Sequence, residues 1–313
     1  MALFERHDVV VPPSPVLVVA LEGWIDAGLA AATAWSAMSD EIPTEVVATF
    51  DAEELIDFRA RRPHLKIVDG LNAGLTWYRP ELRVGTDRNG IGVAFLVGPE
   101  PDFRWKTFAA SVAALAVELG CRIMVGFGGF PATVPHTRPI RLAATASEPV
   151  LAEQVGFVSG ELEVPAGIEA VLERACSEAG IPSVGLWARV PHYLSASSFP
   201  AAALALLDGL KAVSGVEIDT TSLREAADLG RQRVDELIGE GGEHATLIRN
   251  LEEQIDEVEG TSLGRLEDTG GRLPSGDELA DELERYLRGN PDNPVWPEPQ
   301  DRPEPTPRPE EAG

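Results

Sequence analysis

The sequence of 313 residues is poor in cysteine, with only Cys121 and Cys176, and neither belongs to a CxxC pair. Nothing in it therefore suggests a disulfide framework or a zinc site built on cysteine. Two isolated thiols fit a reducing compartment. We accordingly expect a cytoplasmic protein without a structural metal.

Long apolar runs are also missing, since no segment reaches the roughly 18 apolar residues that a membrane-spanning helix needs. The N-terminal sequence MALFERHDVV carries charges where a signal peptide would need apolar residues. We therefore expect neither export nor insertion into a membrane.

Basic residues are scarce, because 26 Lys and Arg face 51 Asp and Glu, which gives a formal net charge of −25. Binding to a phosphate backbone requires clustered Lys and Arg, so we expect no nucleic-acid partner and no anionic membrane partner. The acidity is concentrated late in the chain. Residues 216–313 carry 26 acids and 10 bases, whereas residues 1–215 carry 25 acids and 16 bases.

Motifs for nucleotide binding and nucleophilic catalysis are absent from the sequence. Neither GxGxxG nor GxxxxGK[ST] occurs, and the serines near position 197 lack a GxSxG elbow. We therefore expect no cofactor and assign no catalytic residue.

Apolar segments that alternate with helical patterns make up the first two thirds of the chain. We expect strands over 16–21, 45–50, 82–85, 91–97, 121–127 and 183–190, and helices over 26–38, 51–58, 103–119, 165–179 and 199–213. The Asn89-Gly90 pair predicts a tight turn between two antiparallel strands. The alternation predicts an α/β fold with helices on both faces of a mixed, mostly parallel sheet.

The strand signals stop after Gly215, and three helices are expected, from Ser222, over 245–258 and over 275–289. From Asn290 onward the chain has eight prolines in 24 residues and few apolar side chains, which favours disorder. We expect an α/β core domain over 1–215, an acidic helical extension over 216–289 and a disordered Pro-rich tail over 290–313.

Polar residues follow several of the expected strands, where ligands of open α/β sheets tend to bind. The candidate cleft consists of Glu22, Trp24, Asp26, Arg59, His136, Arg138 and His192. Carboxylates beside imidazoles suit acid–base chemistry or metal binding. Structural roles account for the same residues, because Asp26 can cap a helix, Glu22 can pair with an arginine and the histidines can bond to backbone carbonyls. We assign no metal site.

Spaced blocks of the chain, in the same order, resemble the proteasome assembly chaperone 2 family of bacteria and archaea. They are residues 20–28, 50–54 with 57–59 and 62–63, 98–101 with 104–105, 134–139, and 186–188 with 191–193. The resemblance covers roughly residues 7–260. The sequence departs from the family pattern at residues 163–168, where many relatives have Tyr-x-Gly-Pro-Thr-Gly.

The resemblance implies a three-layer αβα fold similar to purine nucleoside phosphorylase and related hydrolases. It also implies a homo-oligomer, for which a trimer is the first expectation, and protein partners related to the proteasome. We therefore expect a non-enzymatic interaction or assembly factor. The alternative is a small-ligand-binding protein or a hydrolase- or phosphorylase-like enzyme that uses the candidate cleft at the carboxyl ends of the parallel strands.

Overall fold

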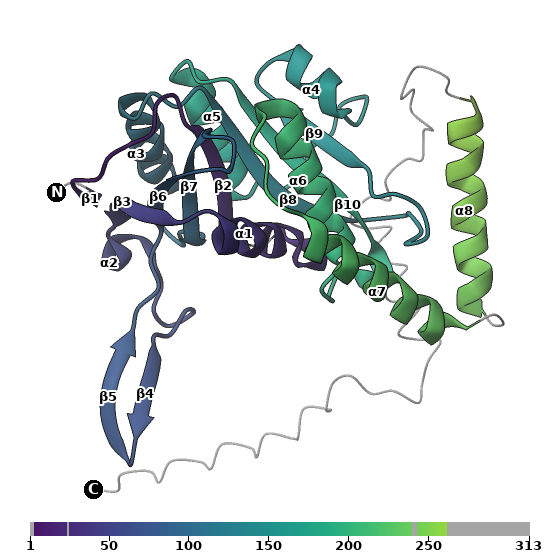
Figure 1. Ribbon diagram of the computed structural model, residues 1–313, viewed down its shortest axis with the longest axis horizontal. Coiled ribbons are helices and arrows are strands. Elements are labelled where there is room, and N and C mark those ends of the chain that lie inside the picture. Colours follow the sequence, from purple (N-terminus) through teal and green to yellow (C-terminus); the bar gives the residue numbers. More distant parts are fainter. Residues whose placement is uncertain (1–2, 24, 240–242, 262–313) are drawn as a thin grey trace, which may run out of the picture. The chain divides into compact units, whose positions relative to one another are not determined.

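The computed structural model describes residues 3–23, 25–239 and 243–261. Trp24, the helix expected over 275–289 and the Pro-rich tail lie outside the described residues. The described part contains an α/β unit in which helices cover both faces of one large sheet (Figure 1).

The large sheet has eight strands in the order β1-β3-β6-β7-β2-β8-β10-β9. Their bounds are β1 (Phe4–Arg6), β2 (Val16–Glu22), β3 (Thr44–Phe50), β6 (Glu81–Thr86), β7 (Gly92–Pro99), β8 (Ile123–Ala132), β9 (Leu142–Ala146) and β10 (Ser183–Pro191). The neighbours β7, β2, β8 and β10 run parallel, and the strands outside them are joined by antiparallel pairs. The expected mixed sheet is confirmed, and its parallel strands form its centre.

The helices form two layers around this sheet. Their bounds are η1 (Ala27–Leu29), α1 (Ala30–Glu41), α2 (Ala52–Leu55), α3 (Trp105–Glu118), α4 (Pro149–Val155), α5 (Ile168–Glu178), η2 (His192–Leu194), α6 (Pro200–Ser214), α7 (Thr221–Ile238) and α8 (Glu243–Thr261). Helices α1 and α6 pack on one face, and α3 and α5 pack on the other. This is the expected three-layer arrangement with a helical extension.

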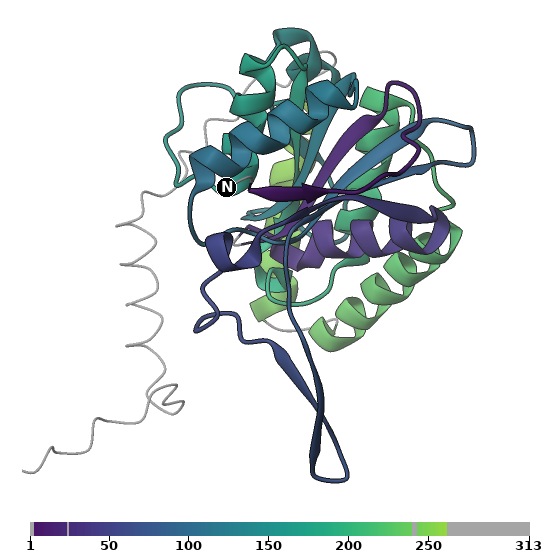
Figure 2. The same ribbon diagram turned by 90° about the vertical axis from the view of Figure 1, so that its left-hand side faces the viewer.

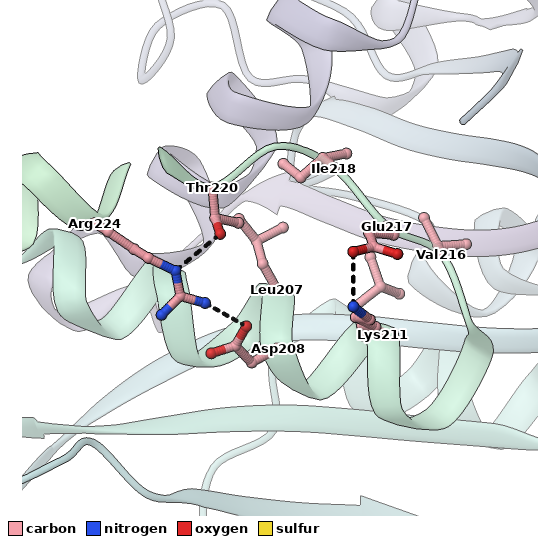
Figure 3. A pocket seen from close by; sticks show the side chains of 9 residues that line it. Leu207, Asp208, Lys211, Val216, Glu217, Ile218, Thr220 and Arg224 are labelled. Carbon is pink, nitrogen blue, oxygen red and sulfur yellow. Dashed lines mark hydrogen bonds and ion pairs between the residues drawn. The ribbon is translucent and has the colours of Figure 1, made fainter. Parts of the chain in front are cut away.

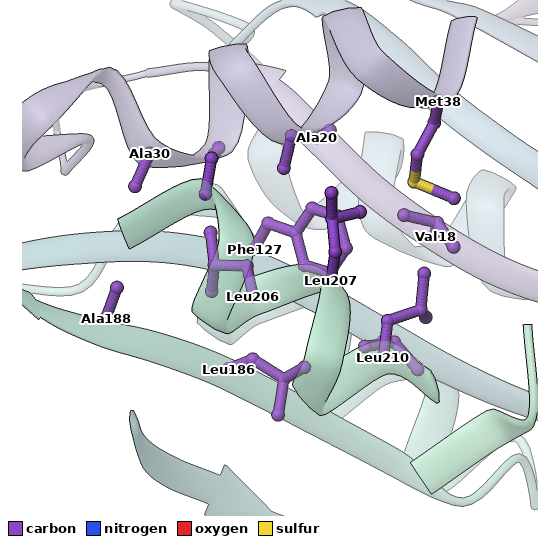
Figure 4. Close-up of a cluster of buried hydrophobic side chains, with 14 of the residues drawn as sticks. Val18, Ala20, Ala30, Met38, Phe127, Leu186, Ala188, Leu206, Leu207 and Leu210 are labelled. Carbon is purple, nitrogen blue, oxygen red and sulfur yellow. The ribbon is translucent and has the colours of Figure 1, made fainter. Parts of the chain in front are cut away.

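The central strand β2 explains why both layers form. Val16 and Val18 contribute to the cluster under α1 and α6, whereas Leu17 and Val19 contribute to the cluster under α3 and α5. Figure 4 shows the first cluster, in which Val18 lies among side chains of the helices and of the neighbouring strands. Full burial of one such side chain stabilises the fold by about 1.5–3 kcal/mol, so a strand that is apolar on both sides is held in the middle of the sheet.

The turn between β6 and β7 forms where the sequence predicts it. One carboxylate oxygen of Asp87 accepts the N–H groups of Asn89 at 2.9 Å and Ile91 at 2.8 Å. Gly90 adopts φ +83°, a conformation that costs glycine little. These contacts set the antiparallel register of β6 and β7.

A second, two-stranded sheet consists of β4 (His64–Val68) and β5 (Leu71–Thr76). This hairpin extends away from the α/β layers, as both views of the molecule show (Figures 1 and 2). Every residue of the two strands is exposed. The sequence patterns did not predict it, and we call it the hairpin arm.

Candidate functional site

Asp26 occupies the entrance of the first helical segment, just after β2. Its carboxylate oxygens accept the N–H groups of Ala31 at 2.7 Å and Ala32 at 3.1 Å. Its backbone also forms an isolated parallel bridge with Gly129 at the end of β8. Burial raises the pKa of Asp26, while the N–H groups of Ala31 and Ala32 lower it. The carboxylate thus serves as the expected helix cap, although the capped helix begins one short 3₁₀ turn later.

Glu22 and Arg59 lie apart from hydrogen-bonded networks. Both residues are exposed. The carbonyl of Glu22 accepts the N–H of Glu100 at 2.9 Å, and the N–H of Arg59 is donated to Asp57 at 2.9 Å. Their contacts therefore come from the backbone.

His136 lies in the loop between β8 and β9, and both of its ring nitrogens have partners. Nδ1 is 2.9 Å from the Tyr193 hydroxyl, and Nε2 is 3.0 Å from Oδ1 of Asp235 in α7. The same hydroxyl accepts the backbone N–H of His136 at 2.9 Å. The buried ring therefore ties the loop to η2 and to α7.

His192 joins this group only through its neighbour in η2. It is exposed, and its ring packs edge-on against Tyr193 with centroids 5.2 Å apart. Tyr193 thus stands between the two imidazoles. Burial raises the pKa of its hydroxyl, which favours the protonated form that donates hydrogen bonds.

The two residues after His136 bind α8. Nε and Nη2 of Arg138 donate to the two carboxylate oxygens of Asp256 at 2.9 and 2.6 Å, which is a bidentate pair. Glu252 accepts from Nη1 of Arg138 at 3.2 Å and from the Thr137 hydroxyl. Three consecutive side chains of this loop therefore contact acids of the helical extension.

The structure brings some of the predicted residues together and leaves others apart. His136, Arg138 and His192 gather around the β8–β9 loop and η2. Asp26 contacts the same end of β8 through the backbone of Gly129. Among the described residues, the side chains of Glu22 and Arg59 have no hydrogen-bond or ion-pair partner.

A group of buried carboxyl residues, which the sequence analysis missed, lies on the face covered by α3 and α5. Glu169, in the first turn of α5, packs against the sheet at Gly126 and Gly185, where an added Cβ would overlap its Oε1 or approach it to 2.9 Å. Oε1 has no hydrogen-bond partner among the described residues. Glu173 accepts a hydrogen bond from Thr145 at 2.6 Å.

Burial raises the pKa of Glu169 well above its usual range, and the nearby carboxylates Glu173 and Asp26 raise it further. A neutral carboxyl is therefore favoured at this position. Glu100, directly after β7, is also buried, and its Oε1 accepts the N–H of Ile168 at 2.9 Å. From the sequence, Glu169 looks like an ordinary acid in the first turn of a helix, where it would interact with the helix dipole. The only sequence signal for its burial is the presence of Gly126 and Gly185, which pair with each other and leave room for its side chain.

Two cavities stand out in the described part of the chain. One of about 90 Å³ lies between α6 and the segment that leads to α7, and the pairs Arg224–Asp208 and Lys211–Glu217 border it (Figure 3). It is small beside the 300–1,000 Å³ of typical ligand sites. The other, of about 520 Å³, is lined by His136, Thr137, Asp235, Glu236, Ile238, Gly239, Ala245, Ile248 and Arg249. Of the described candidate residues, only His136 lines either cavity.

In residues 3–23, 25–239 and 243–261, no group of three or more His, Cys, Asp or Glu is arranged to hold a metal ion. None of the helices within these segments is both long enough and apolar enough to span a bilayer. Burial raises the pKa of both Cys121 and Cys176 to about 12, so neither thiol forms the reactive thiolate readily.

Comparison with known proteins identifies relatives over most of the chain. A Mycobacterium tuberculosis protein of unknown function shares 33% identity, with a TM-score of 0.76 over 83% of this chain and 90% of its own. A Mycobacterium tuberculosis proteasome-assembly chaperone homologue shares 33% identity, with a TM-score of 0.69 over 74% of this chain and 99% of its own. A PAC2 family protein from Streptomyces avermitilis shares 37% identity, with a TM-score of 0.67 over 75% of this chain and 99% of its own.

No curated protein gives a significant match. The model of the PAC2 family matches residues 20–238, which run from the end of β2 through α7. The resemblance found in the sequence blocks is therefore confirmed, and the chain belongs to the PAC2 family.

Proposed function

We propose that this protein is a non-enzymatic interaction or assembly factor that works through the hairpin arm. The observation that carries the proposal is the exposure of apolar side chains on that arm, where Ile67 is 63% and Leu71 is 72% exposed. An isolated two-stranded hairpin is marginally stable in water, and exposed apolar strands mark interaction sites. A binding partner would cover these side chains.

Family membership supports the same proposal. One relative is described as a proteasome-assembly chaperone homologue. We propose accordingly that the partners of this chain are proteins, with proteasome subunits as the first to test, and that it acts in the cytoplasm as a homo-oligomer. A trimer remains the stoichiometry to test.

The proposal does not extend to catalysis by the candidate cleft. A catalytic site requires polar groups that converge on one space with atoms free for a ligand. His136 and Arg138 are engaged by Asp235, Glu252 and Asp256, which suits a structural role. The family's phosphorylase-like fold does not itself specify a reaction.

The proposal is tested by native affinity capture from the cytosol with the full chain and with a chain whose residues 64–76 are replaced by a short Gly-Ser linker. Proteins captured by the parent and lost with the arm support the proposal, and their identity names the client. Equal capture by both chains contradicts it. Addition of purified proteasome subunits to each chain then tests that client directly.

A further inference from the structure

The hairpin arm differs in charge from the rest of the molecule. Residues 59–79, which contain the arm and its base, carry five bases and one acid, a net charge of +4. The remainder of the chain accordingly carries −29. A basic, apolar arm on an acidic protein is attracted to surfaces like those of its own chain, and copies of the arm repel one another.

A second exposed apolar segment lies between α4 and α5, over residues 157–164. Phe157, Val158, Leu162 and Val164 are each between 43% and 65% exposed. Glu161 and Glu163 alternate with the last two of these side chains, and the segment has no basic residue. It therefore combines apolar groups with negative charge, as the arm combines them with positive charge.

The two surfaces do not cover each other within one molecule. Every residue of β4 and β5 is exposed, and so is every residue from 157 to 164. Each surface therefore remains available to another molecule. The outer edges of β4 and β5 also offer backbone groups to an added strand, which is a common mode of peptide recognition.

We propose that the hairpin arm of one copy docks on residues 157–164 of a second copy. This inference rests on the proposed function and specifies one of its partners. Apolar side chains supply the buried area, while the exposed Arg59, Arg62 and Lys66 face Glu161 and Glu163. Charge favours this pairing over arm against arm or segment against segment, because both of those bring like charges together.

The proposed contact joins two different surfaces and is therefore heterologous. Such a contact produces a closed ring when its rotation closes, and a filament when it does not. Each molecule offers one arm and one segment, so it binds two neighbours. A ring of few copies would account for a homo-oligomer without any contact between the sheets.

The test uses two full-length variants with a charge placed in an exposed apolar position. The arm variant is Leu71→Asp and the segment variant is Val164→Asp. The control is Val10→Asp, which lies outside both surfaces and has a side chain that is 89% exposed. Because all three sites are exposed, each variant should keep the secondary structure of the parent, which far-UV circular dichroism checks.

Molar mass is then measured by sedimentation equilibrium. We expect an oligomer for the parent and for Val10→Asp, and monomers for Leu71→Asp and Val164→Asp alone. An equimolar mixture of the two monomeric variants should form a 1:1 complex of twice the monomer mass. In this complex the intact arm of Val164→Asp docks on the intact residues 157–164 of Leu71→Asp. High salt should weaken the parent oligomer.

Several outcomes would overturn the inference. These are a monomeric parent, a Val164→Asp variant with the mass of the parent, or folded variants that remain monomeric when mixed. The first two outcomes leave the proposed function intact if the arm still captures other proteins. If the parent self-associates as expected but captures the same other proteins with and without residues 64–76, the proposed function is refuted and the inference is not.

Discussion

The carboxyl group of Glu169 occupies the space above Gly126 that a side chain at position 126 would fill. This relationship places an acid of α5 directly on β8, where its Oε1 is buried. Burial raises the pKa of Glu169, and its Oε1 has no hydrogen-bond partner among the described residues. Glu169 is therefore a source of instability that depends on pH.

We predict that Glu169→Met stabilises the protein and that the gain grows as the pH rises. The unfolded side chain has a pKa of about 4.3, and the folded carboxyl keeps its proton at higher pH. Above a pH of about 4.3 the unfolded state therefore binds fewer protons than the folded state, and stability falls as the pH rises. Methionine has a similar size and does not titrate. Urea denaturation at several pH values between about 4 and about 8 measures the effect.

The control for this experiment is Glu178→Gln, at the exposed end of the same helix. It should change stability by less than about 0.5 kcal/mol at each pH. If the curves for Glu169→Met and the parent run parallel across the range, Glu169 is not buried as an uncharged group.

We predict that Asp26→Ala destabilises the fold by about 0.5–2 kcal/mol, the usual effect of removing a helix cap. Ala31 and Ala32 would lose the carboxylate that accepts their N–H groups. Asp26→Asn keeps an oxygen acceptor and should recover part of the loss. A stability equal to that of the parent in Asp26→Ala would show that the cap is not needed, and thermal unfolding detects either result.

Six of the eight strands of the large sheet were predictable from their apolar patterns, as were helices α1, α3, α5 and α6. Strands β1 and β9 and helix α4 were not predicted, and α4 has no buried residue that could form an apolar pattern. A strand such as Val16–Glu22, apolar on both faces, belongs in the middle of a sheet that helices cover twice. The hairpin arm was not predictable in this way. Its strands are short and all of their side chains are exposed. The sequence therefore lacks the alternation of buried and exposed residues that indicates a strand packed on a core.

The candidate site was only partly predictable, because its partners are distant in sequence. The loop residues His136 and Arg138 were identified, but Asp235 and Asp256 lie 99 and 118 positions further along the chain. Only the tertiary fold brings residues so far apart in the chain together, and no local sequence pattern marks them as partners. The assignment of residues 1–215 as a separate core domain stays a prediction.

We predict that Arg138→Glu loosens α8 from the β8–β9 loop. The change removes the bidentate pair with Asp256 and places like charges together. Amide hydrogen exchange over 245–257 should become faster, and the exchange of β2 should stay unchanged. Adding Asp256→Arg to Arg138→Glu should restore part of the protection, and a double variant with no recovery would argue against direct pairing.

At a protein concentration low enough for the parent to be monomeric, we predict that replacing residues 64–76 with a Gly-Ser linker shifts the melting temperature by no more than about 2–4 °C, which corresponds to roughly 1 kcal/mol in a domain of this size. The arm lies outside both apolar clusters, so its loss leaves the core packing intact. Differential scanning calorimetry gives the answer. A much larger drop would mean that the arm supports the core.

The most direct test of an interaction role is photo-crosslinking of the full chain in an extract of its native cells. A photo-reactive phenylalanine analogue is placed at position 71 on the arm and, in a control chain, at position 10, where Val10 is 89% exposed. If the arm binds other protein molecules, position 71 should give discrete crosslinked species that position 10 does not give. No crosslinks from position 71, or the same crosslinks from both positions, would contradict the account.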